Sequence, residues 1–203
     1  GVNFIEKLVT RHPGETVAAG SKPVLRVFVS ALTVAEILAV SAALMLASQV
    51  RLYLPFTPVP VTLQTLVILL VPFWCRFWRA TLGIALFTLL GGVAAVFGVT
   101  FFASVTGATW GYILGFLVAP AMAASFPRRP VYVPVAMACM LAVIYLFGIV
   151  WLAWWLDLSL YAAFMLGVLP FLLGDALKLV LAAGLVIWRD SRSNPVDADS
   201  IHA

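Results

Sequence analysis

The sequence predicts an all-α integral membrane protein with six transmembrane helices. Apolar residues make up 64% of the chain and charged residues only 10%, whereas soluble domains carry about 25% charged residues. The apolar residues fall into six runs that are separated by connections of different composition, some of them polar or proline-rich. Lysine and arginine gather on alternate connections, which is the pattern of a chain that crosses a membrane several times.

The first 23 residues are polar and mixed in charge, so they predict no secretory signal peptide. A short interfacial helix is expected at 4–9. A spanning helix needs about 20 residues, and the second and third apolar runs reach that length only with uncharged flanking residues. We predict a cytoplasmic N-terminal segment at 1–23, a six-helix transmembrane domain at 24–188 and a cytoplasmic tail at 189–203. The six runs are 24–50, 61–72, 80–91, 110–126, 131–155 and 164–188.

The basic residues predict the orientation of the helices. Of the 12 lysines and arginines, only Arg51 lies on the side away from the termini, and Lys178 lies within the last run. Because basic residues stay in the cytoplasm, both termini are expected there. The others, on the side of the termini, are Lys7, Arg11, Lys22, Arg26, Arg76, Arg79, Arg128, Arg129, Arg189 and Arg192.

The three connections on the outer side are unusual. Pro55, Pro58 and Pro60 disfavour a helix in the first and favour extended backbone. The second, 92–109, is apolar and uncharged. In the third, Ser159 is expected to cap a short helix, and Pro170 to lie in the first turn of the last span. Irregular backbone of this kind must be buried in protein or line a cavity. We therefore expect a pocket on the outer side, with simple tight turns as the alternative.

An acid and a base lie inside the last apolar run. Asp175 and Lys178 stand three residues apart and so share one face of a helix. With Pro170 in the first turn, they lie about 8–12 Å from the outer end of that helix. Charges at this depth are costly unless they face protein or a wet cavity. The pair is either a site for a polar ligand with an anion and hydrogen-bond donors, or a structural pair that fixes helix packing.

Three stretches of the chain closely resemble one family. LPFTPVPVTLQTL (54–66), GYILGF (111–116) and GVLPFLLGDALK (167–178) resemble the BioY family, the biotin-binding S components of energy-coupling factor (ECF) transporters. The resemblance spans residues 24–188 and implies that they capture biotin from outside with high affinity. It implies uptake across a bacterial cytoplasmic membrane, with biotin as substrate and no cofactor. A transmembrane coupling subunit and two ATPase subunits are the implied partners, and the chain itself has no GxxxxGK[ST] phosphate-binding loop.

The resemblance also implies site residues. Lys178 would complement the carboxylate or the ureido oxygen of biotin, and Asp175 would accept a ureido N–H; which end of biotin meets the pair stays open. The chain departs from the family pattern GPTGGY at 107–112, where Trp110 is expected to narrow the pocket or stack on the ligand. The family's Gly-Leu-Pro-Val-Phe step is matched only loosely by 94–97. The implied ligand-binding residues are Phe56, Thr57, Pro58, Thr62, Gly111, Tyr112, Asp175 and Lys178.

The first apolar run carries two further features. Alanines recur at every fourth position, and small residues at this spacing let helices approach closely in lipid. The resemblance assigns the first four to the interface with the coupling subunit, and an internal packing seam is the alternative. Glu36 lies about 15 Å into the helix, and we expect it to be neutralised by burial or pairing, or to be proton-sensitive. The alanines are Ala31, Ala35, Ala39, Ala43 and Ala47.

Other function classes fit the sequence less well. Both histidines, His12 and His202, lie in the polar ends, and neither HExxH nor GxSxG occurs, so an intramembrane enzyme is disfavoured. No run has the repeated polar face of a water-filled pore, and no pattern of a nucleic-acid-binding face or a metal site is present. An S component for another small vitamin remains possible for the Asp-Lys pair, whereas the proline-rich motif favours biotin.

Overall fold

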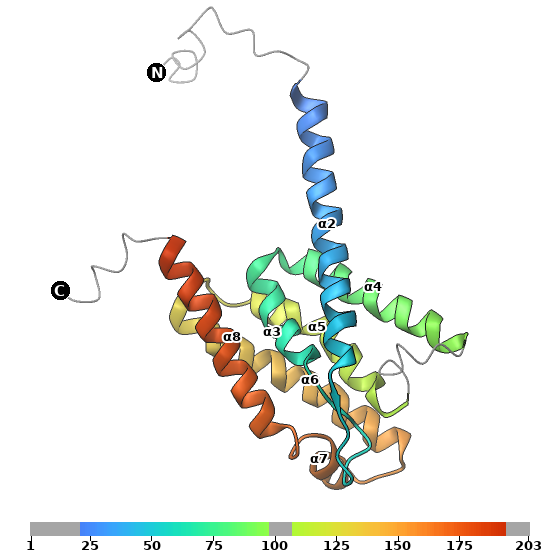
Figure 1. Cartoon of the computed structure of the whole chain (residues 1–203). Helices are drawn as coiled ribbons and strands as arrows, with labels where there is room; N and C mark the ends of the chain where they lie inside the picture. The colour runs from blue at the N-terminus through green and yellow to red at the C-terminus, as the bar shows by residue number, and fades with distance from the viewer. Residues whose placement is uncertain (1–20, 98–106, 194–203) are drawn as a thin grey trace, which may run out of the picture. The chain divides into compact units, whose positions relative to one another are not determined.

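The computed structural model describes residues 21–97 and 107–193, with side chains at 31–97 and 107–192. The chain divides into two units, 1–34 and 35–203. The described part of the first unit is the start of helix α2 (Ser21–Gln49), and the second unit holds the remainder of α2 and all other described elements (Figure 1). The interfacial helix expected at 4–9 lies outside the described residues.

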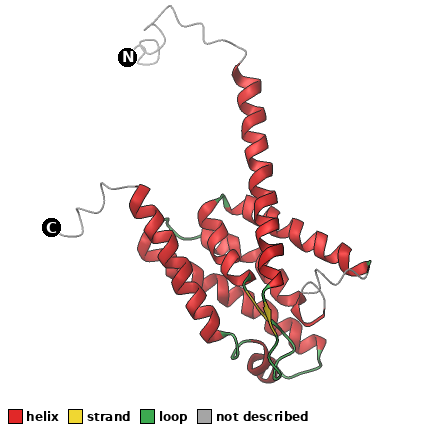
Figure 2. Cartoon of the chain, viewed as in Figure 1, coloured by secondary structure: helices red, strands yellow, loops and turns green. Residues whose placement is uncertain are grey.

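Helices form most of the described chain (Figure 2), so the predicted all-α class is confirmed. A two-stranded antiparallel hairpin, β1 (Arg51–Leu52) and β2 (Val61–Thr62), follows α2. The remaining elements are α3 (Gln64–Trp74), α4 (Phe77–Val96), the 3-10 turn η2 (Gly107–Thr109), α5 (Trp110–Ala124), the 3-10 turn η3 (Pro130–Tyr132), α6 (Val133–Trp155), α7 (Leu160–Gly167) and α8 (Leu172–Ser193).

Four described segments are long and apolar enough to cross a membrane: Ala31–Gln49, Phe77–Val96, Gly107–Ala124 and Pro130–Trp155. The pair α7 and α8, bent by 57°, forms a fifth candidate. Helix α3 has 11 residues and is therefore about 16 Å long, roughly half of the hydrocarbon thickness. The second predicted run therefore does not reach the length of a membrane-spanning helix by itself.

Local sequence signals explain how these elements begin and end. The proline-rich segment is non-helical between the two strands, as predicted. Ser159 caps α7 by accepting a hydrogen bond from the Ala162 amide at 3.2 Å, which confirms the expected short helix. The expectation for Pro170 was wrong, because α8 begins at Leu172, after a turn in which the Phe171 amide donates to the Val168 carbonyl. Asp175 therefore lies in the first turn of α8.

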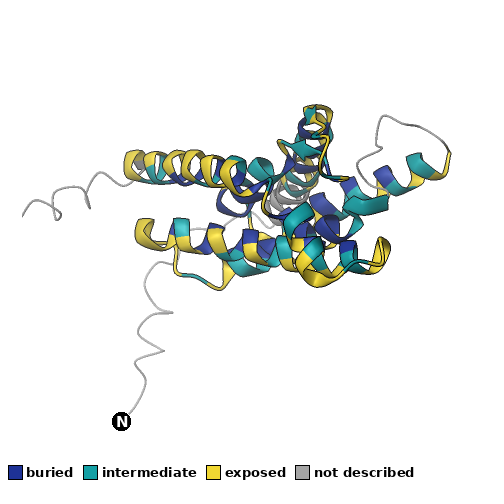
Figure 3. Ribbon diagram, turned by 90° about the horizontal axis from the view of Figure 1, so that it is seen from below, coloured by how far each residue is buried: buried dark blue, intermediate teal, exposed yellow. Residues whose placement is uncertain are grey.

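The second unit is packed as expected for a membrane protein. Buried residues lie mainly where the helices face one another and exposed residues on the sides turned away (Figure 3), although many exposed residues are large and apolar, such as Leu146 and Leu173. Helices α5 and α6 pack closely because glycine lies at their contact. A Cβ on Gly115 of α5 would lie only 2.7 Å from the Cα of Ile144 of α6. Outer faces of this composition suit contact with lipid.

Glu36 has a partner in the structure. Its Oε2 accepts a hydrogen bond from the Arg79 Nη1 at 2.7 Å, and the Glu36 and Arg79 side chains are 39% and 18% exposed. The predicted runs 61–72 and 80–91 leave Arg79 in the connection between them, but it belongs to the first turn of α4, which begins at Phe77. The expectation that Glu36 is paired is confirmed, and the ion pair joins the second half of α2 to α4.

Candidate ligand-binding site

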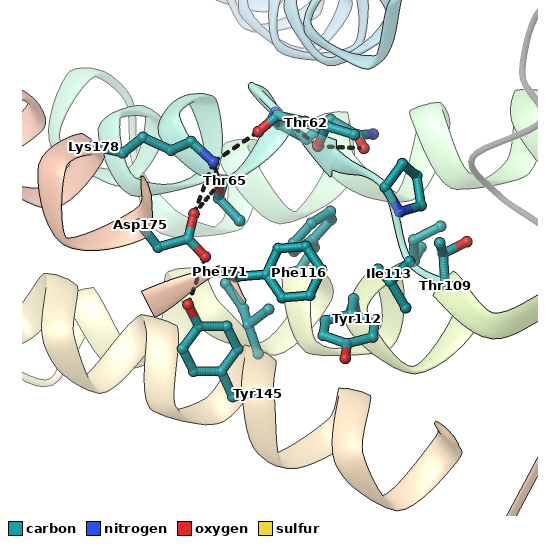
Figure 4. Close-up of a pocket in the computed structure, with 14 residues that line it drawn as sticks. Thr62, Thr65, Thr109, Tyr112, Ile113, Phe116, Tyr145, Phe171, Asp175 and Lys178 are labelled. Atoms are coloured by element: carbon teal, nitrogen blue, oxygen red, sulfur yellow. Dashed lines mark hydrogen bonds and ion pairs between the residues drawn. The ribbon is translucent and has the colours of Figure 1, made fainter. Parts of the chain in front are cut away.

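A cavity lies between the hairpin and the helices α3, α5, α6 and α8 (Figure 4). It has a volume of about 50 Å³, within about 520 Å³ of unfilled space that includes its open mouth. Its lining is mainly apolar and aromatic, with one ion pair and several hydroxyl and amide groups. The lining residues are Val59, Pro60, Thr62, Gln64, Thr65, Thr109, Tyr112, Ile113, Phe116, Ile144, Tyr145, Phe171, Asp175 and Lys178.

The ion pair of the cavity is formed by Asp175 and Lys178. The Lys178 Nζ lies 2.8 Å from the Asp175 Oδ1, and the two residues are 9% and 4% exposed. The predicted i, i+3 spacing brings both side chains to the same face of α8. Asp175 also lies in the first turn of this helix, where the free amides favour a negative charge.

Two other helices hold the carboxylate of Asp175. The Thr65 Oγ1 in α3 donates to Asp175 Oδ1 at 3.0 Å, and the Tyr145 hydroxyl in α6 donates to Oδ2 at 2.6 Å. The Lys178 ammonium donates to the Thr62 carbonyl at 2.8 Å and to Thr65 Oγ1 at 2.9 Å, besides the carboxylate. Its three N–H donors are therefore all used, whereas a carboxylate can accept about four hydrogen bonds and has capacity for one more.

Tyr112 positions the start of α8. Its hydroxyl points away from the ion pair (Figure 4) and donates to the Gly167 carbonyl, at the end of α7, at 2.7 Å. A Cβ at Gly167 would clash with this hydroxyl, so only glycine lets the Tyr112 hydroxyl reach the Gly167 carbonyl. The aromatic ring lines the cavity, while the hydroxyl fixes the turn between α7 and α8. Tyr112 therefore links the wall of the cavity to the position of Asp175.

Gln64 brings a buried donor to the cavity wall. Gln64 is 4% exposed, and its Oε1 accepts a hydrogen bond from the Thr62 hydroxyl at 3.2 Å. Its Nε2 has no hydrogen-bond partner among the described residues. A buried amide donor without a partner costs about 1–3 kcal/mol. An acceptor oxygen on a ligand in the cavity would relieve this cost.

The cavity contains half of the residues expected from the sequence. Thr62, Tyr112, Asp175 and Lys178 line it together. Phe56 is 59% exposed and lies outside the lining, as do Thr57, whose Oγ1 accepts from the Val59 amide, and Pro58. Gly111 is buried against Phe147 and Trp151 of α6, so its small size serves helix packing.

Sequence reasoning missed four polar residues of the cavity: Gln64, Thr65, Thr109 and Tyr145. Gln64 and Thr65 lie two and three residues after Thr62, within a motif already singled out, and could have been included as the first turn of a helix. Tyr145 is the one hydroxyl-bearing residue of α6, and an isolated polar group in an apolar span marks a site. Trp110, expected to reach the pocket, packs against the core instead.

The loosely matched step at 94–97 falls mainly within α4, which ends at Val96, and the following residues 98–106 lie outside the described part. No group of three or more His, Cys, Asp or Glu side chains that could hold a metal ion occurs among the described residues.

Comparisons with known proteins agree with this arrangement. The family model described as "BioY family" matches residues 21–193. The chain belongs to the BioY family. A BioY-family relative from Pyrococcus horikoshii, described as a probable biotin transporter BioY, is 34% identical over 128 residues, which cover 62% of this chain and 76% of the relative. The fold is similar to the crystal structure of an S component for biotin from an ECF-type ABC transporter. That match has a TM-score of 0.67 and 18% identity, and covers 80% of this BioY-family chain and 92% of the other.

Substituting Lys178 with Met is expected to lower the thermal midpoint, because it leaves the buried Asp175 carboxylate without its cation. Breaking a buried ion pair costs about 3–5 kcal/mol, and each kcal/mol corresponds to about 2–4 °C for a chain of this size. Adding Asp175→Asn to Lys178→Met should recover part of the loss. A double-mutant cycle by thermal unfolding in detergent measures this coupling.

The pair Arg189–Asp190 serves as the control for this cycle. Its side chains are 32% and 42% exposed, and such pairs contribute about 1 kcal/mol or less. If the effects at Asp175 and Lys178 were merely additive, the two residues would not stabilise the fold as a pair.

Proposed function

We propose that this chain binds biotin with high affinity as the substrate-binding S component of an ECF-type transporter. The observation that carries the proposal is the buried Asp175–Lys178 network, which lines a cavity in a chain of the BioY family. A buried ion pair held by hydrogen bonds from two other helices stabilises one arrangement of the cavity wall. A ligand with several fixed polar groups can be recognised by such a wall.

The chemistry of biotin matches the groups that line the cavity. Its ureido ring has two N–H donors and one carbonyl, and its valeryl chain ends in a carboxylate. The remaining acceptor capacity of Asp175 suits a ureido N–H, and the free amide N–H groups of Gln64 suit a carbonyl or carboxylate oxygen. Phe116 and Phe171 offer apolar surface to the rings and the chain.

The loop between the two strands is proposed to cover the ligand. The cavity is narrow, so a bicyclic ligand requires the wall to move. Val59 and Pro60 of this loop line the cavity, and Phe56, Thr57 and Pro58 directly precede them. A modest movement of the loop would bring these three residues against the ligand. We therefore keep Phe56, Thr57 and Pro58 as proposed ligand-binding residues. Lys178 holds the end of the loop through the Thr62 carbonyl.

We propose six membrane crossings, with both termini in the cytoplasm and the cavity towards the outer side. The distribution of basic residues supports this topology. The short helix α3 is extended by the hairpin that precedes it, whose strands pair with each other and whose Thr62 carbonyl is bound by Lys178 at the cavity. Non-helical backbone at membrane depth is tolerated in such a position.

The exposed alanines of α2 are proposed to contact the coupling subunit of an ECF module with two ATPase subunits. Ala35 and Ala39 are exposed and Ala43 is half-buried, whereas Ala47 is buried. This gradient favours a partner surface over an internal seam for the first part of the stripe. Small exposed residues at this spacing allow a second helix to approach closely.

Replacing Asp175 with Asn is expected to weaken biotin binding by about 2–5 kcal/mol, because a buried charged acceptor is lost; this corresponds to about 30-fold or more in the dissociation constant. The measurement is equilibrium binding to the purified chain in detergent. Asp157→Asn is the matched control: Asp157 is exposed and has a φ of 52°, which asparagine tolerates. Wild-type affinity in the Asp175 variant would exclude this carboxylate from the site.

Replacing both Ala35 and Ala39 with Leu is expected to leave biotin binding unchanged and to abolish assembly with the coupling subunit. The larger side chains would keep the partner helix at a distance. Co-purification with an ECF module measures assembly, and Ala138→Leu with Ala142→Leu on α6, both exposed and four residues apart, is the matched control. Lost biotin binding in the α2 variant, with assembly retained, would place the stripe at an internal seam.

A further inference from the structure

A second cavity lies at the opposite ends of α3, α5 and α6. It is bounded by the end of α3, the start of α4, the end of α5 and the start of α6, and its volume is about 280 Å³. The ligand-binding site, in contrast, involves the start of α3, the start of α5 and the middle of α6. The two cavities therefore have separate walls. The connections around the second cavity are the ones rich in arginine.

The wall of this second cavity carries uncompensated positive charge. Arg76 and Arg128 line it, Arg129 is adjacent in the chain, and no acidic residue is among the lining residues. Within the described part of the chain, Arg79 and Arg189 have carboxylate partners, but no carboxylate lies within ion-pair distance of these three arginines. Arg128 is oriented by a hydrogen bond from its Nη2 to the Pro72 carbonyl at 3.2 Å.

The rest of the lining is apolar and aromatic. Phe73, Phe77, Phe126 and Tyr132 contribute to it, and Phe77 and Tyr132 are 45% and 38% exposed. Trp74, beside the cavity in the chain, is 50% exposed. Aromatic side chains of this kind are enriched where a membrane protein meets the lipid headgroups. The cavity thus combines guanidinium groups with apolar surface at the end of membrane-spanning helices.

We propose that this second cavity binds the headgroup of an anionic phospholipid, with the phosphate held by Arg76 and Arg128. Guanidinium groups bind phosphate through paired, charge-assisted hydrogen bonds. Basic pockets between helices on the cytoplasmic side suit anionic headgroups. The aromatic residues contact the glycerol and the first part of the acyl chains. The bound lipid bridges the α3–α4 and α5–α6 connections, close to the hydrogen bond from Arg128 to the Pro72 carbonyl of α3.

Native mass spectrometry of the purified full chain in detergent tests this site. Phosphatidylglycerol is expected to bind about tenfold or more tightly than phosphatidylcholine, because only its headgroup has a net negative charge for the arginines. Replacing Arg76 and Arg128 together with Gln should remove this preference. Replacing Arg189 and Arg192 with Gln removes the same charge from the end of α8 and should leave the preference intact. Arg76→Glu, at an exposed side chain, is a second variant in case the double variant does not fold.

Four outcomes would overturn the proposal. Equal binding of the two lipids by the wild-type chain would show that the net negative charge of the headgroup does not contribute to binding. A preference that survives in the Arg76 and Arg128 variants would place the lipid elsewhere. Glycerol 3-phosphate that displaces phosphatidylglycerol with equal affinity would identify a site for free phosphate compounds. Loss of assembly with the coupling subunit, without any change in lipid binding, would instead assign the arginines to a protein partner.

Discussion

A buried carboxylate and a buried ammonium in one apolar bundle constrain the structure more than any other feature. Each charge would be costly alone in this environment, and together they require hydrogen bonds for every remaining donor and most acceptors. Asp175 and Lys178 meet this requirement only when α3, α6 and the hairpin bring Thr65, Tyr145 and the Thr62 carbonyl to them. The same contacts therefore determine both the packing of the helices and the geometry of the cavity.

Other elements of the fold set where this network lies. The break between α7 and α8 places Asp175 in the first turn of a helix, and Tyr112 fixes that break through the Gly167 carbonyl. Glycines between α5 and α6 allow these helices to approach until both line one cavity. The hairpin connects α2 to the site, since its second strand supplies the carbonyl that Lys178 binds. The same wall that stabilises the fold thus presents acceptor and donor groups to a ligand.

Much of this arrangement could be predicted from the sequence, because it depends on local signals. The apolar runs, the proline-rich loop, the Ser159 cap and the i, i+3 pair each follow from residues close together in the chain. The partners of the pair are 30 and 110 residues away, and no local pattern specifies such a contact. The role of Gly111 is not specified locally either: glycine indicates close approach, but the sequence does not say whether a ligand or a helix approaches.

The measurement that tests the central claim most directly is equilibrium binding of biotin to the purified chain in detergent, beside biotin methyl ester and thiamine. We expect tight, saturable binding of one biotin per chain and none of thiamine. Weak binding of the ester would mean that the cavity recognises the carboxylate of biotin. Tight binding of the ester would indicate that the Asp175–Lys178 pair contacts the ureido ring. No binding of biotin, or equal binding of thiamine, would contradict the account of this cavity as a biotin site.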